Sequence, residues 1–196
     1  MVTLTKKERE TILLLFKDYT VFYNANSISK RLGISHVGAQ KIFKRLLQEN
    51  LVISKTIGKS IIYKLNFGND YVTHILTFLL ADEANKFKRW KEEFKELFKE
   101  GRIVMLFGSV IKNYTHANDI DIIVVIKNNE IREVNAALKK KEEILPKKLH
   151  AIKLNHQDLL ENLKNKNKAF VDIIKNAIVI YGYDTYAGLM KNVTSF

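Results

Sequence analysis

The amino-acid sequence predicts an α+β protein, in which a helical N-terminal domain with a β-hairpin is joined by a helical connector to a C-terminal domain with a mixed β-sheet. Apolar residues recur at helical spacing over the first 50 residues. Residues 71–100 contain neither glycine nor proline, whereas Ile103–Phe107 and Ile122–Ile126 are short apolar runs typical of buried strands. The predicted domains are residues 1–66, 67–100 and 101–196.

The composition excludes several classes of protein. The chain has 196 residues, of which 46% are apolar, so it can bury a core and is not a disordered tail. It contains no cysteine, which excludes a disulfide scaffold, a thiolate zinc site and a cysteine nucleophile. Its longest apolar runs fall far short of the ~18 residues of a membrane span, and charged residues precede any apolar stretch of the kind found in a signal peptide. We therefore expect a cytoplasmic protein without a membrane partner.

The whole chain has a formal net charge of +12, and the positive charge is concentrated in its first third. Residues 1–66 contribute 12 basic and 4 acidic side chains, residues 67–100 contribute 6 and 7, and residues 101–196 contribute 15 and 10. A local surplus indicates a surface that binds a polyanion. The lysine clusters Lys139–Lys141 and Lys147–Lys148 are expected to be solvated helix ends, with contact to a nucleic-acid backbone as the alternative.

The first domain contains the start and stop signals of three helices. Thr5 and Glu8 have the spacing of a capping box at the start of the first helix. Gly33 is expected to end the second helix, and Ser35 can cap the third. The expected helices cover residues 6–19, 27–32 and 36–49.

Two strands are expected after the third helix, at Leu51–Lys55 and Ile61–Leu65, joined by a turn at Ile57-Gly58-Lys59. Together with the segments Ser27–Ser35 and Phe43–Leu46, this arrangement resembles the winged helix-turn-helix domains of prokaryotic regulators over residues 1–66. The resemblance implies that the partner is DNA. The residues implied to contact DNA are His36, Val37, Gln40, Lys41 and Lys44 on the recognition helix, and Lys55, Lys59 and Lys64 on the wing. Winged helices also serve as protein–protein or dimer modules, so a protein-binding module, including one that forms a homodimer, is the alternative.

The connector has the pattern of one long amphipathic helix, or of two helices joined near Ala81–Ala84 and ended by Gly101. Its apolar stripe consists of Phe87, Trp90, Phe94, Leu97 and Phe98. A stripe at this spacing is far more often core or dimer contact than a ligand site, so we expect the connector to position two domains.

Two short motifs in the third domain have the chemistry of a phosphoryl-transfer site. The strand Ile103–Phe107 ends at Gly108 and Ser109, where the missing Cβ and the small hydroxyl let the backbone approach a phosphate at a following helix N-terminus. In Asp119-Ile-Asp121 the carboxylates are two residues apart on a strand, so both point to one face while Ile120 points into the core. Two carboxylates on one face suit Mg²⁺, a hard cation that takes oxygen ligands together with substrate phosphates.

The order and spacing of these motifs resemble the DNA polymerase β nucleotidyltransferase superfamily, in particular its minimal prokaryotic members, over residues 101–182. The resemblance implies that Asp119 and Asp121 are catalytic and bind Mg²⁺, or Mn²⁺ in its place. It also implies an NTP substrate, with ATP as the first candidate. The residues implied to bind the triphosphate are Gly108, Ser109 and Lys112.

One position departs from the family pattern. Active members usually carry a third carboxylate on a later strand, but the candidate strand Leu149–Leu154 has His150 there. An imidazole can receive a proton or hold a water, but it does not supply the negative charge that helps to gather two divalent ions. Asp158 and Glu161 have the positions of a helix start and a helix surface, so we do not expect them to replace the missing carboxylate.

Three functions are compatible with the sequence. The first is a Mg²⁺-dependent enzyme that transfers NMP from an NTP to a hydroxyl of a protein or nucleic acid, with the winged helix localising it on DNA. The second is a DNA-binding transcriptional regulator whose degenerate nucleotidyltransferase fold senses nucleotide without catalysis, which His150 favours. The third is the antitoxin half of a two-gene system, with a companion toxin as the protein acceptor.

Overall fold

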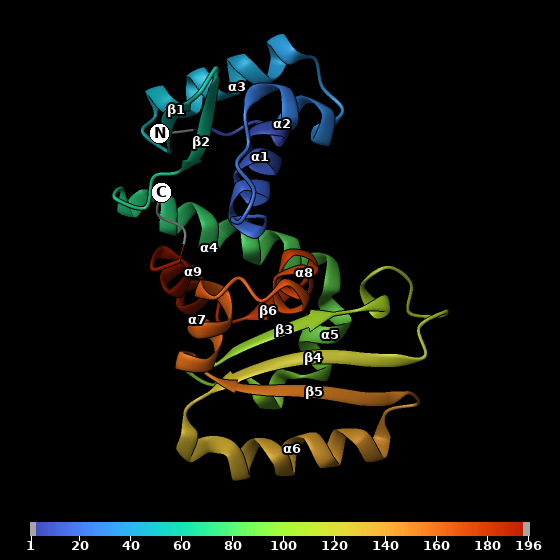
Figure 1. Ribbon diagram of the computed structural model, residues 1–196. Helices are drawn as coiled ribbons and strands as arrows, with labels where there is room; N and C mark the ends of the chain where they lie inside the picture. The colour runs from blue at the N-terminus through green and yellow to red at the C-terminus, as the bar shows by residue number, and fades with distance from the viewer. Residues whose placement is uncertain (1–2, 194–196) are drawn as a thin grey trace. The chain divides into compact units, whose positions relative to one another are not determined.

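A computed structural model describes residues 3–193 of the chain (Figure 1). The chain divides into a first compact unit that ends at Leu79 and a second that extends from Leu80 to Val193. Helices and two separate sheets are present, so the predicted α+β class is confirmed. Between residues 3 and 193, each helix is too short or too polar to cross a lipid bilayer.

The first unit has the three helices and the hairpin expected from the sequence. The capping box between Thr5 and Glu8 is formed, Gly33 ends the second helix at φ 61°, and the Ser35 hydroxyl accepts a hydrogen bond from the N–H of Gly38. The elements are α1 (Lys6–Lys17), α2 (Ala25–Leu32), α3 (His36–Gln48), β1 (Val52–Ile57) and β2 (Ser60–Leu65). Helix α2 begins two residues earlier than predicted, because Asn24 caps it through a reciprocal pair of hydrogen bonds with Ser27.

Contacts between elements fix helix α3, the predicted recognition helix, within the first unit. The Glu8 carboxylate of α1 is only 3% exposed and lies 3.1 Å from the Arg45 guanidinium of α3. On the other side of α3, the ring of Phe43 stacks on Tyr63 of the wing, with centroids 3.8 Å apart. The N–H of Tyr63 donates to the carbonyl of Tyr23, which adds a short bridge to the hairpin. The wing and the recognition helix are therefore held together by packing as well as by chain connection.

The second unit is a four-stranded sheet with helices on both faces. Helix α4 (Asp70–Ala84) contains the point at which the two units divide. The short elements that follow it are η1 (Asn85–Phe87), α5 (Lys88–Glu93) and η2 (Lys95–Leu97). The remaining elements are β3 (Ile103–Phe107), η3 (Ser109–Ile111), β4 (Asp119–Ile126), η4 (Asn128–Glu130), α6 (Ile131–Ile144), β5 (Lys148–Asn155), α7 (His156–Lys164), α8 (Lys168–Asn176), β6 (Ile178–Tyr181) and α9 (Tyr183–Lys191).

The strand order in this sheet is β5-β4-β3-β6. Strand β3 is antiparallel to both β4 and β6, whereas β4 and β5 are parallel, so the sheet is mixed as predicted. Helix α6 makes the crossover from β4 to β5 and lies beside β5 (Figure 1). Helices α7, α8 and α9 also contact strands of the sheet, and each of them contributes buried side chains to the core of the unit.

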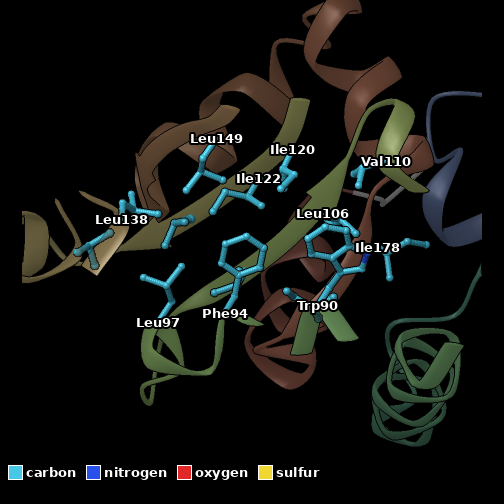
Figure 2. Packing of buried hydrophobic residues seen from close by; sticks show 14 of the residues in the cluster. Trp90, Phe94, Leu97, Leu106, Val110, Ile120, Ile122, Leu138, Leu149 and Ile178 are labelled. Atoms are coloured by element: carbon cyan, nitrogen blue, oxygen red, sulfur yellow. The ribbon is translucent and has the colours of Figure 1, made fainter. Parts of the chain in front are cut away.

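The aromatic stripe predicted for the connector lies in the core of the second unit. Figure 2 shows Trp90, Phe94 and Leu97 packed toward Ile120 and Ile122 of β4. All of these side chains are 5% exposed or less. Of the two alternatives, the structure has two helices: α4 ends at Ala84, a 3-10 turn leads into α5, and α5 ends at Glu93, before Gly101. The stripe therefore builds the scaffold under β4.

A buried ion-pair network links the start of β3 to the start of α6. Arg102 is 1% exposed, and its guanidinium lies 3.2 Å from Glu130 and 2.8 Å from Glu133. Lys99 reaches the same two carboxylates, at 3.2 Å and 2.9 Å. Burial opposes ionisation of Glu130, but hydrogen bonds from Arg102, the backbone of Lys127 and Lys99 lower its pKa to about 2. The network anchors the strand that leads to Gly108.

Candidate active site

Three polar side chains from two neighbouring strands meet on one face of the sheet. Asp119 and Asp121 are alternate residues of β4, so they point to the same face, and Ile120 between them is fully buried. In the parallel register of β4 and β5, Asp121 pairs with His150. The Nδ1 atom of His150 lies 3.3 Å from Oδ2 of Asp119 and 3.4 Å from Oδ1 of Asp121. His150 thus stands beside the two aspartates, at the position where the sequence has a histidine instead of the third carboxylate.

The three side chains differ in exposure, which leaves the group open on one side. The side chain of Asp121 is 19% exposed, that of Asp119 33% and that of His150 44%. Burial, followed by the neighbouring charge of Asp119, raises the pKa of Asp121, and contact with His150 opposes this shift. Two carboxylates held close together favour the binding of a cation, and the exposed side of the group lets a cation enter from solution.

Gly108 lies directly against Asp121 because its neighbour Phe107 pairs with Asp121 across β3 and β4. Its backbone has φ 77° and ψ −158°, a conformation that side chains with a Cβ rarely adopt. A Cβ placed on Gly108 would lie 2.1 Å from Oδ2 of Asp121, far inside van der Waals contact. The glycine is therefore required for the backbone to approach the carboxylate pair.

The residues after Gly108 form a shorter element than expected. The helix predicted to start at Ser109 is the single 3-10 turn η3, which is anchored by the buried Val110. Ser109 is exposed, and its carbonyl accepts the N–H groups of Lys112 and Asn113. Lys112 is exposed at the end of the turn, and no polar contact between residues 3 and 193 joins it to the aspartates. The structure thus brings Gly108 to the carboxylates and leaves Lys112 outside them.

Lys147 is a structural residue of this site that the sequence did not indicate. Its ammonium donates hydrogen bonds to the carbonyls of Tyr114 at 2.6 Å, of Thr115 at 3.3 Å, and of Ala117. It also lies 4.6 Å from the centre of the Tyr114 ring, and the Arg89 guanidinium lies 4.0 Å from the same ring centre. These contacts hold the loop that leads into Asp119.

The expectation that the lysine clusters are solvated helix ends is wrong for Lys147 and also for Lys141. Lys141 is 9% exposed and lies 3.3 Å from Glu93 and 3.7 Å from Glu96. The partners of both lysines are about 30 or more residues away in sequence, so charge clustering alone could not reveal them. Lys148, by contrast, is exposed as predicted.

The helix-turn-helix surface of the first unit carries most of the residues predicted to contact DNA. A surface hollow of about 350 Å³ brings His36 and Gln40 of α3 together with Lys59 of the wing. Asn24 and Tyr63 also line this hollow and were not predicted. The other predicted residues are exposed outside the hollow; they are Val37, Lys41, Lys44 and Lys55. Lys64 differs from them, since it is partly buried and lies 5.0 Å from the ring centre of Phe22.

Two solved structures resemble the chain at low sequence identity. The adhesin competence repressor AdcR from Streptococcus pyogenes is 12% identical with a TM-score of 0.38, and the likeness covers 74% of this chain and 84% of that one. ZitR from Lactococcus lactis is 16% identical with a TM-score of 0.35, covering 72% of this chain and 75% of that one. No curated protein matches the sequence. Assignment to a family therefore depends on the sequence of the second unit.

Residues 90–186 match the family described as polymerase beta, nucleotidyltransferase. This part of the chain is a nucleotidyltransferase domain of the polymerase β type. The matched residues of the nucleotidyltransferase domain include Trp90 at one end, the Gly108-Ser109 turn, and all three side chains of the polar group on β4 and β5. The whole chain therefore joins a winged helix-turn-helix unit to a nucleotidyltransferase domain.

The polar group of the nucleotidyltransferase domain fits a divalent cation in part. Asp119, Asp121 and His150 each offer one ligand atom, and these atoms lie within 4.8 Å of one another. Carboxylate oxygens suit any hard or borderline divalent ion. The imidazole nitrogen is not a usual ligand of Mg²⁺, so the donor set as a whole does not match a site built for that ion alone.

Proposed function

We propose that the chain is a divalent-metal-dependent nucleotidyltransferase that transfers NMP from an NTP, ATP being the first candidate, to a hydroxyl on a protein or nucleic acid. The observation that carries this proposal is the convergence of Asp119 and Asp121 beside Gly108, within a domain of the polymerase β family. Mg²⁺ or Mn²⁺, when bound, would supply charge stabilisation for the reacting phosphate.

The reaction balances as a simple displacement. The acceptor oxygen attacks the α-phosphorus of the NTP, the bond from that phosphorus to the bridging oxygen breaks, and pyrophosphate leaves. The proton of the acceptor hydroxyl passes to solvent. Asp119 and Asp121 would hold the cation, and the backbone at Gly108 and Ser109 would receive the triphosphate, because the absence of a side chain at Gly108 permits close approach. Lys112 would add a mobile positive charge.

The test is transfer of label from ATP carrying a labelled α-phosphate to proteins and nucleic acids that co-purify with the chain. We expect labelling by the wild type, and its loss in Asp119→Asn and in Asp121→Asn. Asp172→Asn is the matched control, since Asp172 is an exposed aspartate on α8 of the same unit. Absence of labelling by the wild type with either Mg²⁺ or Mn²⁺ would overturn the enzymatic proposal.

The first unit is proposed to bind DNA through its recognition helix and wing. Support comes from the exposure of the α3 residues and from the hollow that joins Gln40 and His36 to Lys59. Gln40 is the best base reader among them, because an amide can form paired hydrogen bonds with adenine. Gln40→Ala should reduce the preference between DNA sequences, as measured by competition binding, and leave nonspecific binding largely intact. Equal loss for all sequences would argue against base recognition.

A second candidate function is regulation of DNA binding by nucleotide without turnover. The observation that favours it is His150, which lies against both aspartates in place of a third carboxylate. This function predicts that ATP changes the DNA affinity of the wild type while no label is transferred. Asp119→Asn would then abolish the ATP effect and keep DNA binding.

A further inference from the structure

We infer that Asp119, Asp121 and His150 form a metal site that selects a first-row transition-metal ion, such as Mn²⁺, over Mg²⁺, with His150 as a direct ligand. The inference rests on the proposed function, since it names the ion that the same site takes. It makes His150 a determinant of metal specificity rather than a lost catalytic residue.

The two separations from the His150 nitrogen suit a single ion, and all three donor atoms lie within 4.8 Å of one another. Nδ1 of His150 lies 3.3 Å and 3.4 Å from the nearest oxygens of Asp119 and Asp121. Two ligands each about 2.1 Å from a metal ion are roughly 3.0–3.5 Å apart when they bind at adjacent positions. A single imidazole N–H, by contrast, cannot point well at both carboxylates at once. A cation between the three atoms satisfies all of them.

The three donor residues stand on two paired strands and not on loops. Asp119 and Asp121 stand on β4, whose intervening Ile120 is fully buried, and His150 stands on the adjacent strand β5. The parallel pairing of β4 and β5 continues from Asp119 to Ile126, so the relative placement of the ligands is fixed by an unbroken ladder. Sites built on strands keep their ligands more precisely than sites built on loops.

The chemistry of the donors decides which ion is preferred. Mg²⁺ is a hard ion that takes oxygen ligands and keeps several waters, whereas imidazole suits Zn²⁺, Fe²⁺, Ni²⁺ and Cu²⁺ best, and Mn²⁺ is the weakest binder of nitrogen ligands in that series. With His150 in place of a carboxylate, the site has two negative charges where three are usual, which weakens its attraction for every divalent ion. The nitrogen ligand compensates for that loss only with ions that bind nitrogen well. The composition of the site therefore favours a first-row transition-metal ion over Mg²⁺, and Mn²⁺, the weakest nitrogen binder of that series, is the most demanding probe of this preference.

The experiment measures Mn²⁺ binding to the full chain by electron paramagnetic resonance, with Mg²⁺ as competitor. Wild type should bind Mn²⁺ and show nitrogen hyperfine coupling from a directly bound imidazole. His150→Ala should lose the coupling and weaken Mn²⁺ binding by about 10–100-fold, since even indirect partners of a metal ligand are worth that much. His150→Asp should lose the coupling and allow Mg²⁺ to displace Mn²⁺ at lower concentration, because a third carboxylate is restored.

The matched control is His74→Gln, which removes an exposed histidine from α4 in the first unit and should leave Mn²⁺ binding unchanged. Mn²⁺ binding without nitrogen coupling, or with the same affinity in His150→Ala, would overturn the inference and leave the proposed function standing. Failure of both Mn²⁺ and Mg²⁺ to bind, with wild type equal to Asp119→Asn, would overturn the inference and the proposed function together. Thermal unfolding of each variant distinguishes loss of a ligand from loss of the fold.

Discussion

At the level of single residues, the geometry of the candidate active site depends on what Gly108 lacks. The space that a Cβ would need is filled by Asp121, and the backbone of Gly108 has a positive φ. A glycine here serves two purposes, since it permits the conformation and it leaves the carboxylate within reach of the backbone. His150 is a second case in which one residue changes the chemistry of the site without changing the strand that holds it.

Gly108→Ala should abolish metal binding at the aspartates, because the new methyl group forces Asp121 away and strains the turn. We expect at least a 100-fold loss of Mn²⁺ affinity, together with a loss of stability of about 1–3 kcal/mol from the unfavourable backbone. Binding is measured by titration and stability by urea unfolding. Gly188→Ala is the control, since Gly188 lies in α9 with open space around it. This change should keep metal binding and stabilise the helix slightly.

At the level of elements, the loop between η3 and β4 is shaped by a residue from outside it. Lys147 immediately precedes β5, so its hydrogen bonds to the loop carbonyls tie the entry of β4 to the entry of β5. Those two strands carry the three polar side chains of the site. The ion-pair network around Arg102 lies at the start of β3, the end farther from Gly108, and joins that strand to α6.

Lys147→Met should weaken Mn²⁺ binding by about tenfold and lower the midpoint of thermal unfolding, since three carbonyl groups lose their donor. Lys147→Arg should restore part of both, because a guanidinium can still donate to several carbonyls. Lys148→Met removes an exposed lysine one residue away and serves as the control. Equal effects of the changes at Lys147 and Lys148 would show that net charge, and not the loop contact, is responsible.

The Arg102 network predicts a dependence of stability on pH. The pKa of Glu130 is lowered from 4.5 to about 2 in the folded chain. The ionised Glu130 carboxylate therefore contributes about 2 kcal/mol to the free energy of unfolding. This contribution is complete above about pH 4.5 and is lost as the pH falls toward 2. Urea unfolding of the second unit at pH 6 and pH 3 should show a smaller difference in Glu130→Gln than in wild type. Glu143→Gln, at an exposed position of α6, should follow the wild type.

At the level of the whole molecule, both units have a surplus of basic side chains but distribute their charges differently. The first third of the chain has the largest surplus of basic side chains, and those predicted to meet DNA are exposed on α3 and the wing. The second unit places its functional charges in an acidic group that is partly shielded by the sheet. The proposed polyanion surface and the proposed cation site thus belong to different units.

DNA affinity should fall steeply with salt, because phosphate contacts release counterions. The double variant Lys55→Met with Lys59→Met should reduce the slope of log affinity against log salt by about 2, roughly 0.9 for each lost phosphate contact. Lys139→Met, an exposed lysine in the second unit, should leave the slope unchanged. Binding is measured by fluorescence anisotropy at several salt concentrations. A slope that is the same in all three proteins would contradict phosphate contact by the wing.

Several features of the fold could be predicted from the sequence because they depend on neighbouring residues. The capping box at Thr5 and Glu8, the left-handed Gly33 and the alternation of Asp119 and Asp121 along a strand are set by local hydrogen bonds and by backbone geometry. The nucleotidyltransferase motif belongs to this class, since its two halves are short and lie close together in the chain. The apolar stripe that includes Trp90 was also visible, although its packing partners were not.

The tertiary structure alone decided how these local features meet. The sequence placed His150 on a strand, but only the parallel register of β5 with β4 set its Nδ1 between the two aspartates. The sequence also did not identify Lys147 and Arg102 as structural residues, because their partners are far away in the chain. Strand pairing across a helical crossover and burial of a charge are properties of the packed unit, and so the proposed metal ligands and the residues that support them come together only when the sheet is assembled.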